Sequence, residues 1–486
     1  MRLYAINEPG EKLADSTDET FGKGGLAGGI HSAAVLRFSF PWKGETHGMP
    51  AFPGMQDQTP STHRHATRAL ALLLAINLFN YIDRYILAAI EPLISDQFFG
   101  AKDETAMAKT GALATAFLVS YMILAPLFGW LADRFSRWQI IAFGVALWSL
   151  ASGWSGMAAT FTMLVLTRVF VGVGEAAYGP AAPTIISDLY PEEKRGRMLS
   201  YFYVAIPVGS AIGYAFGGAV GQHWGWRWPF YLVTFPGLIL AGLCLFMRDP
   251  RGVRARTEKT HQKPKVTLAD VLALFRIRSY TLNTAAMAAM TFAMGGMSFW
   301  VPRYLYTYRA ADFGGHPDLG KINFTFGAIT ASAGLLATIL GGWTGDRVRR
   351  RFPSAYFLVS AISIFIAFPA TILMLRTPFP GAWALVFCAI FFLFFNTGPA
   401  NAALANVTPS STRATAFALN ILAIHIFGDA ISPPLIGWIA GKSNMNTAFL
   451  VVSGMMAVAS VFWFLGARHL GRDTAAITSS EAASQP

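Results

Sequence analysis

Apolar runs long enough to cross a lipid bilayer recur twelve times along the 486-residue chain. A spanning helix needs about 20 mainly apolar residues, because the hydrocarbon core of a bilayer is about 30 Å thick. The runs cover residues 69–94, 107–130, 139–158, 161–187, 199–221, 228–247, 279–305, 322–345, 354–375, 381–405, 414–440 and 446–467. The pattern therefore predicts an all-α membrane protein with twelve transmembrane helices.

The longest polar interval divides these runs into two groups of six. This interval, residues 248–278, is basic, and its end has the pattern of a short amphipathic helix. We therefore expect one six-helix bundle at 67–247, a cytosolic linker, and a second six-helix bundle at 279–467. Residues 1–66 and 468–486 are mostly polar and contain no run of spanning length, so we expect them to be disordered cytosolic tails.

Composition supports a membrane protein. Hydrophobic residues make up 54% of the chain and charged residues only 13%, whereas a soluble domain carries roughly 25% charged residues. Nineteen Lys and Arg fall in the loops on the side of the N-terminus, and eight in the loops on the other side. This asymmetry predicts that both termini are cytoplasmic. The net charge of +12 thus follows from topology and gives no reason to expect nucleic-acid binding. The compact external loops favour a bacterial inner membrane.

The two predicted halves repeat one another. The segment GWLADRFSR (129–137) follows the second span, and GWTGDRVRR (342–350) follows the eighth. Five positions agree between them. A second echo joins PEEKR (191–195) to PSSTR (409–413) at the ends of spans four and ten. Two pseudo-symmetric six-helix bundles related by an internal repeat indicate a secondary transporter, whose site lies near the bilayer midplane between the halves.

The repeated segment resembles the signature of the major facilitator superfamily. The resemblance implies that Asp133 faces the start of span eleven near Arg413, and that Asp346 faces the start of span five near Arg195. Such contacts would latch the outward-open state and break when the inside opens. Positive-inside loop charge alone would explain the arginines, but not the glycine–aspartate spacing found twice. The predicted latch residues are Gly129, Asp133, Arg134, Arg137, Arg195, Gly342, Asp346, Arg347 and Arg413.

A narrower resemblance lies in spans one, four and five. The segments NYIDRYILAAIEPLI (80–94) and TRVFVGVGEAAYGPAAPTIISDLYPEEKRGRMLSYFYVAIPVGSAIGYAFGG (167–218) are similar to the spinster family of lysolipid and sphingolipid-phosphate transporters. The resemblance implies alternating access and an amphipathic, anionic lipid substrate. It is concentrated in the first half of the chain.

Four ionisable residues lie deep in the predicted spans. Asp83 is 14 residues from the start of its run, or about 21 Å along a helix, and Arg84 follows it. Arg168 and Glu175 are seven residues apart and therefore share one helical face. Four unpaired charges would cost roughly 10–14 kcal/mol in the bilayer, so we expect them to pair and to face a hydrated cavity.

Two interpretations of this group are open. In the first, Asp83 and Glu175 exchange protons while Arg84 and Arg168 bind an anionic headgroup; the spinster resemblance implies the same roles. In the second, the four residues form a structural ion-pair cluster between spans one and four. Buried ion pairs stabilise poorly compared with apolar packing, which favours the functional interpretation.

The second half carries different candidates. Methionine and phenylalanine in spans seven and ten either line an apolar half-cavity for an acyl chain or pack against lipid and neighbouring helices. Asn396, Asn401 and Asn420 are polar exceptions, and His425 with Asp429 is either a second proton site or a mutually satisfied pair. The predicted substrate contacts are Arg84, Arg168, Tyr81, Tyr178 and Asn401.

Small residues and prolines suggest where helices meet and bend. Gly209, Gly213, Gly217 and Gly218 give span five a spacing that permits close helix packing, and the superfamily resemblance implies that this helix moves against span eight. Pro207 and the pair Pro433–Pro434 are candidate bending points, because proline removes a helix hydrogen bond.

The sequence as a whole predicts a proton-coupled secondary transporter of a lysolipid or sphingoid phosphate. The alternative is a proton-coupled facilitator for a small organic anion such as a sugar acid, because the same arginines would bind a carboxylate. We expect a monomer in the lipid bilayer, with lipid substrate and protons as partners, no catalytic residues, no cofactor and no metal. An intramembrane enzyme or lipid scramblase would not need the repeated latch.

Overall fold

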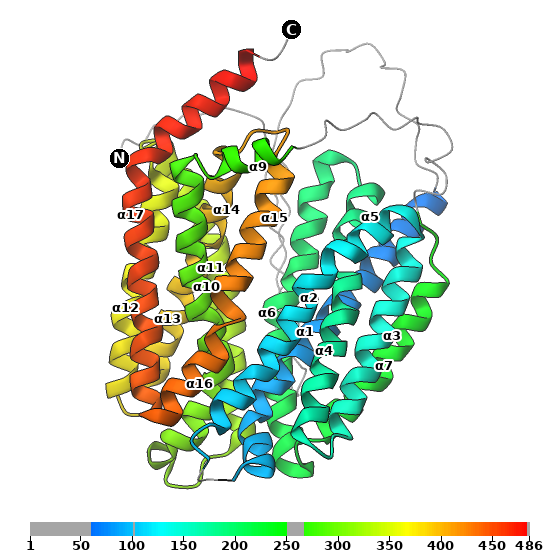
Figure 1. Ribbon diagram of the computed structural model, residues 1–486, viewed down its shortest axis with the longest axis vertical. Coiled ribbons are helices and arrows are strands. Elements are labelled where there is room, and N and C mark those ends of the chain that lie inside the picture. The colour runs from blue at the N-terminus through cyan, green and yellow to red at the C-terminus, as the bar shows by residue number, and fades with distance from the viewer. Residues whose placement is uncertain (1–59, 101–102, 250–266, 484–486) are drawn as a thin grey trace, which may run out of the picture. The chain divides into compact units, whose positions relative to one another are not determined.

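The structure of the chain, a computed structural model, describes residues 60–100, 103–249 and 267–483 (Figure 1). These residues are nearly all helical. The α-helices are α1 (Pro60–Phe98), α2 (Ala106–Arg134), α3 (Arg137–Gly156), α4 (Phe161–Tyr178), α5 (Ala181–Leu189), α6 (Glu192–Trp224), α7 (Trp228–Leu245), α9 (Leu268–Leu274), α10 (Arg278–Arg303), α11 (Leu319–Arg349), α12 (Ala355–Arg376), α13 (Ala382–Phe395), α14 (Thr397–Asn406), α15 (Arg413–Ile424), α16 (Ser432–Lys442) and α17 (Met445–Ala483). Shorter elements are η1 (Tyr304–Tyr308), η2 (Ala310–Phe313) and η3 (His425–Asp429).

These helices confirm the twelve predicted spans. Eleven segments are long and apolar enough to cross a membrane, with spans four, ten and eleven each formed by two successive helices, α4–α5, α13–α14 and α15–α16. The twelfth span is α3, whose 20 residues are about 30 Å long. Its hydropathy is lower because it begins with Arg137 and includes Ser149, Ser152 and Ser155.

The chain forms two bundles of six spans, α1 to α7 and α10 to α17 (Figure 1). In the first, α6 packs on α1 and α3 packs on both α4 and α7; in the second, α17 packs on α10 and α12. The bundles meet mainly where α6 contacts α11 and where α2 contacts α16. We call the side where α1 begins and α17 ends the terminal face, and the other side the opposite face.

The C-terminal segment differs from the prediction. The sequence suggests a disordered tail after residue 467, but α17 continues as a helix to Ala483. Alanine, the best helix former, is frequent here. Asp473 also holds this extension against the start of α10, where the Ser279 N–H and O–H donate to Asp473 Oδ2 at 3.0 and 2.8 Å.

The N-terminal tail and the linker are described only in part. Residues 1–59 lie outside the described residues, and α1 begins at Pro60, before the predicted start of its span. Of the linker, α9 is the expected short helix; a capping box between Thr267 and Asp270 fixes its start.

Three of the four predicted glycines of α6 face α1. A Cβ at Gly209 or Gly213 would lie 2.8 or 2.7 Å from the carbonyl oxygens of Leu78 and Ile82 on α1. Gly217 also faces α1. These glycines therefore permit close contact within the first bundle, and Gly218 alone of the four predicted positions faces α11.

The bend in span eleven precedes the proline pair. Gly428, in the π-helical η3, has φ −111° and ψ −106°, outside the helical range. Pro433 and Pro434 instead lie in the first turn of α16. The N–H groups of a first turn make no hydrogen bond within the helix, so proline, which lacks this group, is tolerated there. Pro207 lies inside the continuous helix α6. The break at Gly428 matters because it positions His425 and Asp429.

Candidate functional site

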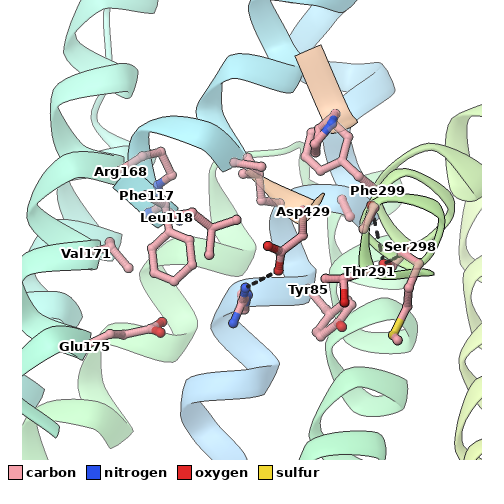
Figure 2. A pocket seen from close by; sticks show the side chains of 17 residues that line it. Tyr85, Phe117, Leu118, Arg168, Val171, Glu175, Thr291, Ser298, Phe299 and Asp429 are labelled. Atoms are coloured by element: carbon pink, nitrogen blue, oxygen red, sulfur yellow. Dashed lines mark hydrogen bonds and ion pairs between the residues drawn. The ribbon is translucent and has the colours of Figure 1, made fainter. Parts of the chain in front are cut away.

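A central cavity lies between the two bundles (Figure 2). Its open space, including the part continuous with solvent, measures about 780 Å³. One wall comes from α1, α2 and α4, and the other from α10, η3 and α16. Figure 2 shows Arg168, Val171 and Glu175 on one side of the cavity, Tyr85 and Ser298 on the other, and Asp429 between them.

A second cavity of about 1000 Å³ adjoins the first. The two share Arg84, Phe117 and Glu175 in their walls, so they lie next to each other. Tyr81 and Tyr178, both predicted substrate contacts, line this second part. The Tyr178 hydroxyl donates to the Leu73 carbonyl at 2.9 Å, which leaves its ring to face the cavity.

Asp83 and Arg168 are connected through serines of α3. The Ser152 hydroxyl donates to Asp83 Oδ1 at 2.5 Å, and Arg168 Nη2 lies 3.4 Å from the same hydroxyl oxygen. Arg168 Nη2 also donates to Ser155 Oγ at 2.5 Å. Both charged residues are buried. The expected proximity of spans one and four is therefore correct, but α3 supplies the atoms that join the acid to the base.

Asp83 and Arg168 each have one side-chain polar atom without a hydrogen-bond partner among the described residues. These two atoms, Asp83 Oδ2 and Arg168 Nε, are buried. Buried polar groups are normally satisfied, so such atoms need an explanation. Arg168 also lines the central cavity, whereas Asp83 lies behind it, toward α3.

Arg84 joins the two bundles. Its Nη2 lies 3.9 Å from Asp429 Oδ2 on η3, and its guanidinium lies 4.9 Å from the centre of the Phe117 ring. The dashed line at Asp429 in Figure 2 marks this contact. His425 Nδ1 lies 2.9 Å from the other oxygen, Asp429 Oδ1. The sequence left the role of Asp429 open, and the structure identifies it as the carboxylate that faces Arg84.

Glu175 faces the same space from α4. It is buried and lines both parts of the cavity. Arg84 lines both parts of the cavity with it, and Arg168 lines the central part. Figure 2 shows Arg168 and Glu175 on the same side of the cavity, as their spacing predicts. The structure therefore brings Arg84, Arg168 and Glu175 to one wall.

Asn401 does not reach this cavity. It lies on α14 outside the walls of both parts, and its amide donates to the Thr397 carbonyl at 2.8 Å. Asn396 and Asn420 are buried elsewhere in the second bundle; their amides contact the Leu393 carbonyl and the Met287 sulfur. Asn401 is thus separate from the other predicted substrate contacts, and its role stays a prediction.

The wall contributed by the second bundle is mixed. Met294, Phe299 and Pro433 supply apolar surface, and Thr291, Ser298 and Asp429 supply polar groups. The expectation of an apolar half-cavity is thus met only in part, by span seven. Span ten contributes to a smaller adjoining cavity instead of the central one.

Two of the predicted latch residues, Arg137 and Asp346, contact residues of their own bundles. Arg137 is buried, and its guanidinium lies 2.7 Å from both Asp188 Oδ2 and Asp249 Oδ1. Asp346 accepts a hydrogen bond from the Tyr356 hydroxyl at 2.8 Å. The pairing of Asp133 with Arg413 across the bundles stays a prediction for the conformation that is closed at the terminal face.

At the opposite face the bundles are held together. The Glu91 carboxylate on α1 binds Arg303 of α10, with Nη1 at 2.8 and 3.1 Å from its two oxygens. The Thr110 hydroxyl of α2 donates to the same carboxylate at 2.6 Å. A Cβ at Gly111 would lie 2.5 Å from the Pro433 carbonyl oxygen of α16. The conformation is therefore sealed at this face.

Comparisons with known proteins agree on one group. Residues 73–399 and 310–483 match the Major Facilitator Superfamily. The chain is 34% identical over 406 residues to Protein spinster of Drosophila melanogaster, covering 82% of this chain and 66% of that protein. It is 36% identical over 435 residues to Sphingosine-1-phosphate transporter SPNS2 of Mus musculus, covering 82% and 77%. The crystal structure of a bacterial homolog to the human lysosomal transporter spinster, inward-facing and occupied, matches with a TM-score of 0.71 at 21% identity, covering 84% and 98%.

Proposed function

The chain belongs to the spinster family of the major facilitator superfamily, and we propose that it is a proton-coupled secondary transporter of a lysolipid or sphingoid phosphate. The observation that carries this proposal is the two-sided cavity between the bundles. Two arginines line it from the first bundle, and apolar side chains line it from both bundles. Such a site suits a molecule with an anionic head and an apolar body.

We propose that Arg84 and Arg168 bind the headgroup. Arg84 and Arg168 both line the central cavity and both are cationic, so a phosphate there would accept charge-assisted hydrogen bonds from them. The mouse relative is described as a sphingosine-1-phosphate transporter, which supports a phosphate headgroup here. A small organic anion would use the same arginines but would leave the apolar side chains without a partner.

Proton coupling follows from competition for the arginines. Arg84 already pairs with Asp429 and lines the cavity together with Glu175, while Arg168 reaches Asp83 through Ser152. A phosphate that binds these arginines replaces a carboxylate as their counterion. The displaced carboxylate then needs a proton to remain in the membrane interior without a charge. Substrate binding at Arg84 and Arg168 is thereby coupled to protonation of Glu175 and Asp83.

Alternating access requires that the bundles close the cavity at one face while they open it at the other, and then reverse. The sealed opposite face and the cavity between the bundles give one conformation, and the predicted latch would close the other. The distribution of Lys and Arg supports a terminal face in the cytoplasm, and the short external loops support a bacterial inner membrane. We propose that a single chain completes the cycle, because its two bundles enclose the cavity.

Substrate-dependent proton flux in proteoliposomes tests this function. With an imposed pH gradient, sphingosine phosphate or a lysophospholipid should drive proton movement, and hexuronate should not. Asp83→Asn and Glu175→Gln should each abolish gradient-driven transport. Flux with hexuronate alone would support the organic-anion alternative. If both variants kept gradient-driven transport, proton coupling through these residues would be wrong.

A further inference from the structure

Asp83, one of the two acids of the proposed proton coupling, does not line the substrate cavity. Its side chain is buried, and its hydrogen bond runs toward α3. Arg168 and Glu175, by contrast, line the central cavity. A proton that Asp83 gains or loses therefore needs a path of hydrogen-bonding groups, because a free charge is costly in the membrane interior.

Three buried hydroxyls lead away from Asp83 into the first bundle. Ser152 donates to Asp83 Oδ1 at 2.5 Å, and the Ser155 hydroxyl donates to Thr167 Oγ1 at 2.8 Å. Ser152 and Ser155 are three residues apart and therefore neighbours on the surface of α3. We call Ser152, Ser155 and Thr167 the hydroxyl row; none of them lines the central cavity or the one next to it.

The hydroxyl row runs toward the opposite face, where α3 ends and α4 begins. Ser155 lies in the last turn of α3, and Met157, just beyond that helix, is 61% exposed. Thr167 lies about 9 Å along α4 from its first residue, Phe161. The bundles are closed at this face by Glu91 and Arg303. The row therefore leads toward the face at which the substrate cavity is closed.

Polar groups at the start of α7 continue these polar surroundings toward the opposite face. The Tyr231 hydroxyl donates to the Gly156 carbonyl at 2.7 Å, and Arg227 Nη2 donates to the Ala158 carbonyl at 3.0 Å. The Tyr231 side chain is half-buried. The end of the row is thus next to groups that water at this face can reach.

Arg168 interrupts the hydroxyl row. Its Nη2 lies 2.5 Å from Ser155 Oγ and 3.4 Å from Ser152 Oγ, so the guanidinium contacts both serines. A fixed positive charge in such a path excludes protons. A phosphate that draws Arg168 toward the cavity removes this charge from between the two hydroxyls. Each hydroxyl both donates and accepts, so it can pass on one proton as it receives another.

We propose that Asp83 exchanges its proton with the opposite face through the hydroxyl row, and that Arg168 keeps this path closed until a headgroup binds it. This inference rests on the proposed function and separates the path of the proton from the path of the substrate. Ser152 gives its proton to Asp83 Oδ1 and receives one from the side of Ser155. Thr167 resupplies Ser155 in turn. One proton enters at the opposite face for each proton that reaches Asp83.

Thr167→Val tests the hydroxyl row with little change in shape. The variant removes the hydroxyl, while Ser155 keeps a hydrogen bond to the Ala151 carbonyl at 3.0 Å and its contact with Arg168. Thr167→Ser is the matched control, because it restores a hydroxyl at the same position. Ser149→Ala is a second control, since it removes a buried hydroxyl of α3 that has no hydrogen-bond partner among the described residues.

The experiment compares two transport modes in proteoliposomes, with sphingosine phosphate or a lysophospholipid as the probe. The first is uptake driven by a pH gradient, recorded together with proton flux. The second is exchange of labelled for unlabelled lipid at equal pH, in which the loaded protein changes conformation without net proton movement. Thr167→Val should lose gradient-driven uptake and proton flux but keep exchange. Thr167→Ser and Ser149→Ala should behave as wild type in both modes.

The outcomes separate this inference from the proposed function. If wild type shows no lipid-dependent proton flux, the proposed coupling fails, and the relay fails with it. If wild type is coupled and Thr167→Val is equally coupled, the proton reaches Asp83 by another path and only the relay is wrong. Equal loss of uptake and exchange in Thr167→Val, or no recovery in Thr167→Ser, would also overturn the relay, because either result indicates a structural role.

Discussion

Arg303 of α10 holds the Glu91 carboxylate of α1 at 2.8 and 3.1 Å and so joins the two bundles at the opposite face. Glu91 is fully buried, and Thr110 of α2 donates to it as well. Three spans from both bundles thus meet at one carboxylate. An ion pair in this position stabilises only the conformation in which this face is closed.

Glu91→Gln should shift the protein toward the conformation that is open at the opposite face. The change leaves the Arg303 charge without its counterion, which for a buried pair costs about 3–5 kcal/mol. Distances between spin labels placed at the ends of α1 and α10 measure the shift. Asp103→Asn is the control, because Asp103 is an acid near the same face whose partner, Lys109, lies in the same bundle. An unchanged distance distribution in Glu91→Gln would contradict this role.

Ser152→Ala should weaken transport more than its small size suggests. Ser152 is the hydroxyl that Asp83 and Arg168 share, and its loss leaves a buried carboxylate oxygen without a donor. The expected cost is about 1–3 kcal/mol, or roughly five- to 150-fold in gradient-driven uptake. Ser149→Ala is the matched control on α3, because the Ser149 hydroxyl is buried and has no hydrogen-bond partner among the described residues. Equal effects of both variants would exclude a specific role for Ser152.

Asp429→Asn should strengthen headgroup binding and impair coupling. Asp429 competes with the substrate for Arg84, but their contact is long, at 3.9 Å, and both side chains are partly exposed, at 15% and 29%. A pair of this kind contributes at most about 1 kcal/mol, so affinity should rise no more than roughly fivefold. Competition binding with a lysophospholipid in detergent gives the affinity. Weaker binding in Asp429→Asn would show that the carboxylate helps to hold the ligand.

The loop before α2 should be insensitive to pH in the range where transport is measured. Hydrogen bonds from Lys109 and Thr105 lower the pKa of Asp103 from 3.8 to about 2. A lowered pKa in the folded protein adds stability above the unfolded value, and this stability is lost as the pH falls from about 4 toward 2. Thermal unfolding of wild type and Asp103→Asn should therefore differ by a constant amount above about pH 5. A difference that changed between pH 5 and 7 would contradict this assignment.

The length and composition of the apolar runs were sufficient to predict the twelve spans. The same features did not predict where the last helix ends, because α17 continues through an alanine-rich segment whose other residues are mostly polar. The break at Gly428 was also missed, because prolines lie nearby and a single glycine in a span carries no distinct signal. Such a local break depends on contacts with neighbouring helices, here the close approach of Gly428 to the Ala288 carbonyl of α10.

The sequence predicted which charged residues lie deep in the spans, but it did not predict which residues they contact. Asp83, Arg84, Arg168 and Glu175 stand out because charges are costly in a bilayer. Their partners do not stand out: a serine such as Ser152 is common in membrane helices. A signal did exist, because Ser149, Ser152 and Ser155 recur every third residue, so neighbours in this row are close on the surface of α3. Asp429 could be placed opposite Arg84 only after the two bundles were assembled.

The close packing of α6 on α1 connects the proposed ligand site to the closed opposite face. Because Gly209, Gly213 and Gly217 bring the two backbones together, α1 and α6 have little freedom to slide past each other. The same pair of helices contacts α11 at Asn323, whose amide donates to the Ala89 carbonyl and whose side chain faces Gly218. If the substrate headgroup binds Arg84 as proposed and shifts α1, then α6 would move with it, and this two-helix unit also forms one side of the closed end. Movement of α1 together with α6 would in this way link headgroup binding to the opening of the opposite face.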